Sequence, residues 1–132
     1  MTTSDLPTGG QPDVSGDTTE APFDDVINLS TSTGDDGTVT VTVVGEVDTF
    51  TAPVLRSSLD SQLEQSPQEL VIDLSGVQFL GSAGLAVLVE TQKAARSRDV
   101  GLRLIATTRA VTRPLEVTGL IDLFTIADST AR

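Results

Sequence analysis

The stretch Leu70–Val89, LVIDLSGVQFLGSAGLAVLV, decides the fold because it places a strand, a connection and a helix in direct succession. Glu69–Leu74 has a compact run of apolar residues, which is typical of a strand that is buried on both faces. We interpret Ser75–Gly81 as a loop. A helix is then predicted from about Ser82 to Arg98, amphipathic in pattern. Its inward face is defined by three apolar side chains: Leu85, Leu88 and Val89.

Upstream of this stretch, the sequence predicts a β-hairpin followed by a helix. Thr38–Gly45 alternates Val with Thr and is β-branched throughout, which favours a strand. Val26–Thr31 is expected to pair with it across a tight turn at Asp36-Gly37. A helix is predicted over Thr51–Gln65, where Pro53 suits the first turn and leucines recur at four-residue spacing.

Downstream, the pattern predicts two more strands around a third helix. Gly101–Ala106 reads as a strand, and the sequence LFTIAD supplies a last short one. The intervening helix, within Thr107–Leu120, is closed by Gly119 at the position after its C-cap. Pro114 falls inside this helix, so we expect a kink or two abutting turns.

The resulting order, β-β-α-β-α-β-α-β, predicts an α/β fold with a small mixed sheet of about four to five strands and helices packed on one face. Residues 26–132 are expected to form this single domain. Residues 1–25 contain six acidic residues and no Lys or Arg, and show no hydrophobic periodicity. They predict an acidic, disordered N-terminal tail.

Composition excludes several classes of function. The formal charge of −11 argues against binding nucleic acid or anionic membranes. No apolar run reaches the length of a membrane span, and the N-terminus lacks the features of a signal peptide, so we expect a cytoplasmic protein. The chain contains no Cys and no His, which removes thiol chemistry, the usual general base and the commonest zinc ligand. We therefore expect neither a metal nor a cofactor.

The sequence also lacks the common catalytic motifs. The sequence has no P-loop, and LGSAGL is not a nucleophile elbow, because Gly81 directly precedes Ser82 and no His exists to act as base. Glu46 and Asp48 form the only suggestive carboxylate pair, and their spacing is more typical of a turn and a helix cap. The sequence therefore predicts that the protein is not an enzyme.

Ser82 admits two interpretations from its position alone. It starts a helix that follows a parallel strand, so it can be the N-cap of that helix. The same position suits negative charge, so it can equally accept a phosphate without unfolding the domain. Asp48, Thr49 or Thr51 could cap the first helix. Because both connections follow strands that should be neighbours, Asp48 and Ser82 are expected to form one patch at the sheet edge.

Three segments, GEVDTFTAPVLRSSL, LVIDLSGVQFLGSAGLAVLV and AVTRPLEVTGLIDLF, resemble the anti-sigma factor antagonist branch of the STAS domain family in order and spacing. The resemblance covers roughly Val26–Ala127. It implies a protein that binds an anti-sigma factor with serine kinase activity when unphosphorylated, and so releases a sigma factor. Phosphorylation by that kinase then breaks the complex, and a serine phosphatase resets it.

The resemblance also implies roles for individual residues. The phosphoacceptor serine of the family's D-S-[ST]-G pattern falls on Ser82, and the acidic residue of its G-E-[LVI]-D motif falls on Asp48. The partner-binding surface implied around them comprises Glu46, Asp48, Thr49, Gly81, Ala83, Gly84 and Leu85.

Two positions depart from that pattern. Gly81 stands where the family has Asp, and Ala83 replaces the second hydroxyl, which leaves Ser82 as the one acceptor candidate in the connection. The missing carboxylate keeps an alternative open. In that alternative, the domain senses a small ligand or scaffolds a signalling complex without being phosphorylated.

Overall fold

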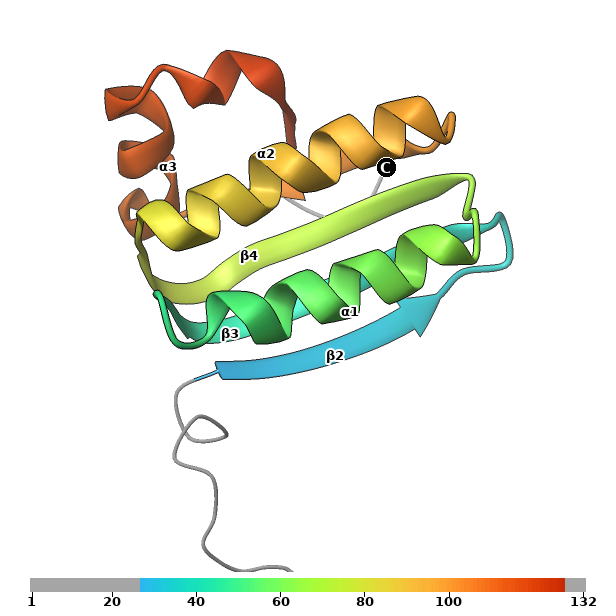
Figure 1. Cartoon of the computed structure of the whole chain (residues 1–132), viewed down its shortest axis with the longest axis horizontal. Coiled ribbons are helices and arrows are strands. Elements are labelled where there is room, and N and C mark those ends of the chain that lie inside the picture. The colour runs from blue at the N-terminus through green and yellow to red at the C-terminus, as the bar shows by residue number, and fades with distance from the viewer. Residues whose placement is uncertain (1–26, 128–132) are drawn as a thin grey trace, which may run out of the picture.

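The computed structural model of the protein describes residues 27–127, so the predicted tail over residues 1–25 lies outside them (Figure 1). Within these residues the elements are, in order, β2 (Ile27–Thr33), β3 (Thr38–Val47), α1 (Ala52–Glu64), β4 (Glu69–Leu80), α2 (Ser82–Ser97), β5 (Gly101–Ile105), α3 (Arg109–Val117), the 3-10 helix η2 (Leu120–Leu123) and β6 (Thr125–Ala127). The predicted order of strands and helices is therefore confirmed.

The strands form one mixed sheet in the order β2-β3-β4-β5-β6. β2 is antiparallel to β3, and every later neighbouring pair is parallel. The hairpin turn is closed by the N–H of Gly34, which donates to the carbonyl of Thr38 at 2.8 Å. Gly37 has a φ of 84°, the left-handed region that glycine adopts readily. The α/β prediction, with a mixed sheet, holds.

The core lies between the helices and one face of the sheet. In β3 the Val residues of the alternation are buried, and in α1 the leucine stripe at four-residue spacing is fully buried against them. α1 and α2 lie side by side across the sheet, and α3 packs against β4 (Figure 1). The predicted two-sided burial of Leu70, Val71 and Ile72 is observed as well. Within residues 27–127, none of the helices combines the length and the apolar character needed to cross a bilayer.

The prediction of a loop over Ser75–Gly81 is wrong, because β4 continues to Leu80. β4 advances one residue more than β3 at two places, next to Ser75 and next to Gln78. At the first of these, Oδ1 of Asp73 accepts hydrogen bonds from the N–H of Ser75 (3.0 Å) and from its hydroxyl. Such bulges bend and re-aim a strand without ending it, so turn-forming residues can lie inside a strand.

The predicted close of the third helix at Gly119 is confirmed, but the expectation of two abutting turns around Pro114 is wrong, because α3 runs through Pro114 as one helix. α3 includes Pro114 and ends at its C-cap, Thr118, while Gly119 follows with a φ of 75°. The chain then turns into η2. The left-handed glycine, rather than the proline, therefore ends the helix.

Candidate functional site

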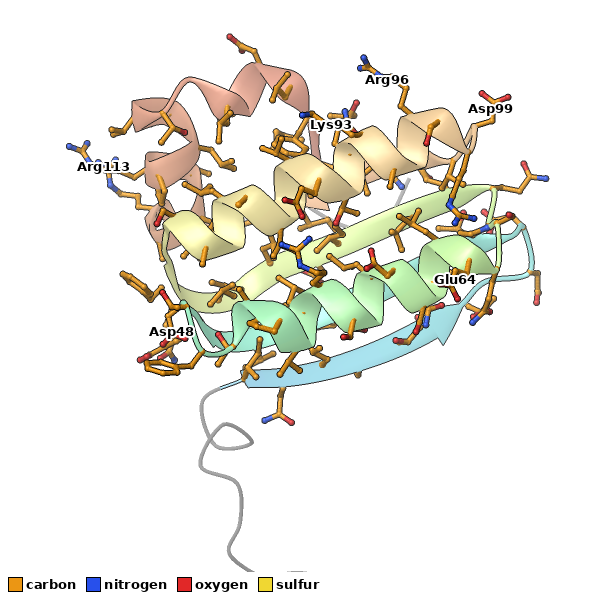
Figure 2. All side chains as sticks on the ribbon, in the orientation of Figure 1. Asp48, Glu64, Lys93, Arg96, Asp99 and Arg113 are labelled. Atoms are coloured by element: carbon orange, nitrogen blue, oxygen red, sulfur yellow. The ribbon has the colours of Figure 1, made fainter. Side chains whose placement is uncertain are left out.

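The candidate site lies at the edge of the sheet where two parallel strands end together. The last residues of β3 and β4, Val47 and Leu80, are register partners, and the N–H of Gly81 donates to the carbonyl of Val47 at 2.9 Å. The chain leaves these strands at Asp48 and Gly81 and enters α1 and α2 (Figure 1). Asp48 accordingly projects at the end of the molecule where both helices begin (Figure 2).

A pocket of about 210 Å³ joins the two connections. It is lined by Asp48, Thr49, Phe79, Gly81, Ser82 and Ala83. The structure thus brings together five of the residues that the sequence singled out, and it adds Phe79, which sequence reasoning left inside a loop.

Asp48 caps the turn that leads into α1. Its Oδ1 accepts hydrogen bonds from the N–H of Phe50 (2.9 Å) and of Thr51 (3.0 Å), and its carbonyl accepts from the N–H of Ala52 (2.8 Å). Thr51, at the formal N-cap position, makes no side-chain capping bond. Of the three predicted candidates, Thr51 holds the N-cap position, but no side chain caps α1 itself, and the Asp48 side chain caps only the turn before it.

Thr51 is the buried centre of this turn. Its side chain is fully buried, and its Oγ1 donates to the carbonyl of Glu46 (2.8 Å) while accepting from the N–H of Asp48 (2.9 Å). Asp48 and Thr51 therefore satisfy each other reciprocally, in the manner of a capping box with Thr in the place of Glu. Sequence reasoning considered Thr51 only as a cap, although the spacing Asp-x-x-Thr is the signal that identifies this pairing.

The hydrogen bonds to the Asp48 carboxylate favour its charged form. The pKa of Asp48 is lowered from its ordinary value, chiefly by the N–H of Thr51. Desolvation opposes this shift, while the N–H of Phe50 and the Thr51 hydroxyl reinforce it. Within residues 27–127, the hydrogen bonds that reach this carboxylate end on Oδ1, so Oδ2 remains available as an acceptor.

Ser82 is the first residue of α2, and its interpretation as the N-cap is wrong. The N-cap is Gly81, with φ −91° and ψ −177°, and no side chain caps this end of the helix. A serine at the first helical position has already adopted helical backbone angles, so its hydroxyl is not placed to accept from the second and third N–H groups. Ser82 is exposed and lies beside the positive end of the α2 dipole.

The two glycines beside Ser82 differ in the space around them. A Cβ on Gly84 would lie 2.6 Å from Val47 Cγ1 and 2.7 Å from Leu80 Cδ1, so glycine is required for α2 to approach the sheet. A Cβ on Gly81 would lie 3.1 Å from the ring of Phe79, which is half exposed and able to move. The backbone at Gly81 is in a region that every residue adopts. Glycine at this position is therefore not a requirement of the fold.

The predicted partner-binding residues divide by exposure. Glu46 and Thr49 are exposed, whereas Asp48, Gly81 and Ala83 are partly buried. Gly84 and Leu85 are buried, so the structure gives Gly84 a packing role and leaves only the edge of Leu85 at the surface.

A second hollow of about 420 Å³ begins at Ser82 and was not expected from the sequence. It runs between α2 and the segment after α3, and is lined by Ser82, Leu85, Ala86, Val89, Glu90, Lys93, Thr118 and Leu120. Neither hollow has the donor set of a metal site, since no three His, Cys, Asp or Glu side chains gather anywhere in residues 27–127.

Comparison with known proteins places the chain in a family. A family model described as the STAS domain matches residues 28–132. The chain is 31% identical over 104 residues to the anti-sigma-B factor antagonists of Staphylococcus epidermidis and Staphylococcus aureus, covering 79% of this chain and 95% of each relative. A crystal structure of an anti-sigma factor antagonist from Mycobacterium paratuberculosis is 36% identical, with a TM-score of 0.75, and the match covers 83% of this chain and 91% of that one. This chain therefore belongs to the STAS domain family, as its resemblance predicted.

Proposed function

We propose that this protein is an anti-sigma factor antagonist whose binding to its anti-sigma factor is controlled by phosphorylation of Ser82. The observation that carries the proposal is the position of Ser82, exposed at the first turn of α2 in a pocket shared with Asp48. Relatives of similar length are named anti-sigma-B factor antagonists, which supports the same role.

In the unphosphorylated state, the edge formed by Asp48 and Ser82 binds an anti-sigma factor that also has serine kinase activity. Binding occupies the anti-sigma factor and leaves its sigma factor free. The chain contributes a binding surface rather than catalytic groups, since it has no His or Cys and its Asp48 carboxylate is engaged in holding a turn. The proposed place of action is the cytoplasm, where sigma factors work.

Phosphorylation changes this surface without unfolding it. A phosphate on Ser82 adds a charge of about −1.5 to −2 at neutral pH. The uncapped first turn of α2 stabilises that charge, since its N–H groups have no side-chain acceptor. Asp48 lines the same pocket and carries a like charge, so the modified edge becomes strongly anionic. The partner dissociates, and a serine phosphatase restores the binding state.

The test is to incubate the protein with ATP and each anti-sigma kinase of its host, and to map the phosphate by mass spectrometry. We expect one phosphate, on Ser82, and none on the Ser82→Ala variant. Phosphate on another residue would refute the assignment of Ser82. If none of these kinases phosphorylates the protein, the proposed control by phosphorylation is refuted.

The hollow of about 420 Å³ beside Ser82 favours a second candidate function, a domain that senses a small ligand or scaffolds a complex without phosphorylation. Its lining is largely apolar, and Gly81 removes the carboxylate expected beside the acceptor. Saturable thermal stabilisation by a nucleotide or a lipid, together with no modification by the kinases, would support this candidate over the first.

A further inference from the structure

Two of the three Phe residues in the described part of the chain are exposed at the surface. The sequence contains four Phe and no Trp or Tyr. Of the three that the structure describes, Phe124 is buried, while Phe50 is 69% exposed and Phe79 is 51% exposed. The core is filled almost entirely by Val, Leu and Ile. Within residues 27–127, the two largest exposed apolar side chains are therefore both Phe, a residue type whose large ring contributes strongly when it is buried in a core.

Both exposed rings belong to the edge that carries Ser82. Phe50 follows Asp48 by two residues, and its N–H donates to Oδ1 of Asp48 at 2.9 Å. Phe79 lines the pocket of about 210 Å³ together with Asp48 and Ser82. Single exposed apolar residues are common, but two aromatic rings beside one candidate site form the kind of patch that marks an interface.

The backbone under each ring is fixed before any partner arrives. The turn of Phe50 is held by the reciprocal bonds of Asp48 and Thr51. Phe79 follows the second bulge of β4 and pairs in register with Glu46, and its ring lies 3.1 Å from the position that a Cβ on Gly81 would take. Little backbone ordering is therefore needed on binding, which favours affinity.

The charge of this edge limits the partner's chemistry. No cationic side chain lines the pocket, whereas Asp48 has a free Oδ2 and Glu46 is exposed beside it. A partner surface must therefore offer a hydrogen-bond donor to Asp48, and it must remove two aromatic rings from water.

We propose that Phe50 and Phe79 are the anchors of the contact with the anti-sigma factor, which receives the two rings in an apolar pocket and places a donor opposite Asp48. This inference rests on the proposed function and specifies its partner. Aromatic side chains in desolvated pockets dominate the energy of many protein interfaces, while the residues around them mainly exclude water.

The anchors also give a physical reason for release by phosphate. A dianion on Ser82 would lie in the same pocket as the Phe79 ring and would have to lose its hydration for the apolar contact to persist. Release then follows from the cost of desolvating the phosphate beside the Phe79 ring, and that desolvation also strengthens its repulsion from Asp48. It does not require a negatively charged partner.

The test compares Phe50→Ala and Phe79→Ala with a matched control. Leu123 is 46% exposed on η2 and does not line the pocket of Ser82, so Leu123→Ala removes exposed apolar surface elsewhere. We expect each Phe variant to bind the anti-sigma factor at least about tenfold more weakly than wild type, and the control to bind within about twofold. Thermal unfolding should be similar for all four proteins, because the replaced side chains are exposed.

A salt titration separates this contact from an electrostatic one. Between about 50 and about 500 mM NaCl, an aromatic contact should lose less than about threefold in affinity. Wild-type affinity in both Phe variants, or a salt dependence greater than about thirtyfold, would overturn the inference while leaving the proposed function intact. Failure of the wild-type protein to bind any anti-sigma factor of its host would overturn both.

Discussion

Asp48 and Thr51 hold each other through paired backbone and side-chain hydrogen bonds. Oδ1 of Asp48 accepts from the N–H of Thr51 at 3.0 Å, and Oγ1 of Thr51 accepts from the N–H of Asp48 at 2.9 Å. Because Thr51 is fully buried, the position of the Asp48 carboxylate at the surface is set from inside the domain. The polar edge of the site is thus connected to the core through one hydroxyl group.

The first prediction concerns that hydroxyl group. Thr51→Val keeps the shape of the side chain but leaves the N–H of Asp48 and the carbonyl of Glu46 without this partner. We expect a loss of about 1–3 kcal/mol in the free energy of unfolding, measured by chemical denaturation. Thr51→Ser should restore most of it. Thr49→Val, at an exposed neighbouring position, should change stability by less than about 0.5 kcal/mol. Equal stability of Thr51→Val and wild type would show that the hydroxyl is not needed.

The second prediction concerns the pH dependence of stability. The pKa of Asp48 in the folded protein is lowered from its ordinary value, chiefly by the N–H of Thr51. A carboxyl whose folded pKa lies below its unfolded pKa binds fewer protons in the folded state. Its stabilising contribution is therefore complete above the unfolded value of about 3.9, and it is lost as the pH falls through the folded value.

Asp48→Asn isolates this contribution, because the amide accepts similar hydrogen bonds but does not titrate. Between about pH 5 and pH 2, we expect the unfolding free energy of wild type to fall more steeply than that of the variant. Every other carboxylate is common to both proteins, so the difference between the two curves belongs to Asp48. Parallel curves would mean that the turn does not depend on the charge of Asp48.

The third prediction separates the two glycines that flank Ser82. Gly84→Ala places a Cβ within 2.7 Å of both Val47 and Leu80, which are buried and have no room to move. Overpacking of this kind costs about 1–3 kcal/mol, and the better helix propensity of Ala recovers up to about 1 kcal/mol of it. We expect a net loss of stability in thermal unfolding. Gly81→Ser should be neutral or gain a few tenths of a kcal/mol, since serine is a good N-cap. A stabilised Gly84→Ala variant would contradict the packing described for α2.

The order of elements could be predicted from the sequence because each helix and strand carries its own periodic pattern. The Val and Thr alternation of β3 and the leucine stripe of α1 are local signals, and the structure uses both for burial. The end of β4 could not be predicted in the same way. Ser75 and Gly76 look like a turn in isolation, and only pairing with β3 keeps them within a bulged strand.

The position of the candidate site at the sheet edge could also be predicted from the sequence, because it depends on the order of the strands. Neighbouring parallel strands must end at the same edge, so the proximity of Asp48 and Ser82 followed from topology. The anchoring role of Thr51 and the exposure of Phe79 depend on which way each side chain points after a turn or a bulge. Those directions are set by tertiary pairing, which the sequence pattern alone does not encode.

The last prediction concerns the charge that α2 accepts at its first residue. Ser82→Asp and Ser82→Asn differ in one charge and hardly in shape, so their comparison isolates the effect of the helix dipole. At low salt, we expect the unfolding free energy of the Asp variant to exceed that of the Asn variant by about 0.3–1 kcal/mol. Repulsion between the new carboxylate and Asp48 reduces this difference, and added salt should reduce it further by screening the charges. Ser82→Asp should nevertheless bind the anti-sigma factor more weakly, whereas Ser82→Ala should bind like wild type. A folded Ser82→Asp protein with wild-type affinity would show that negative charge at this position does not control the partner.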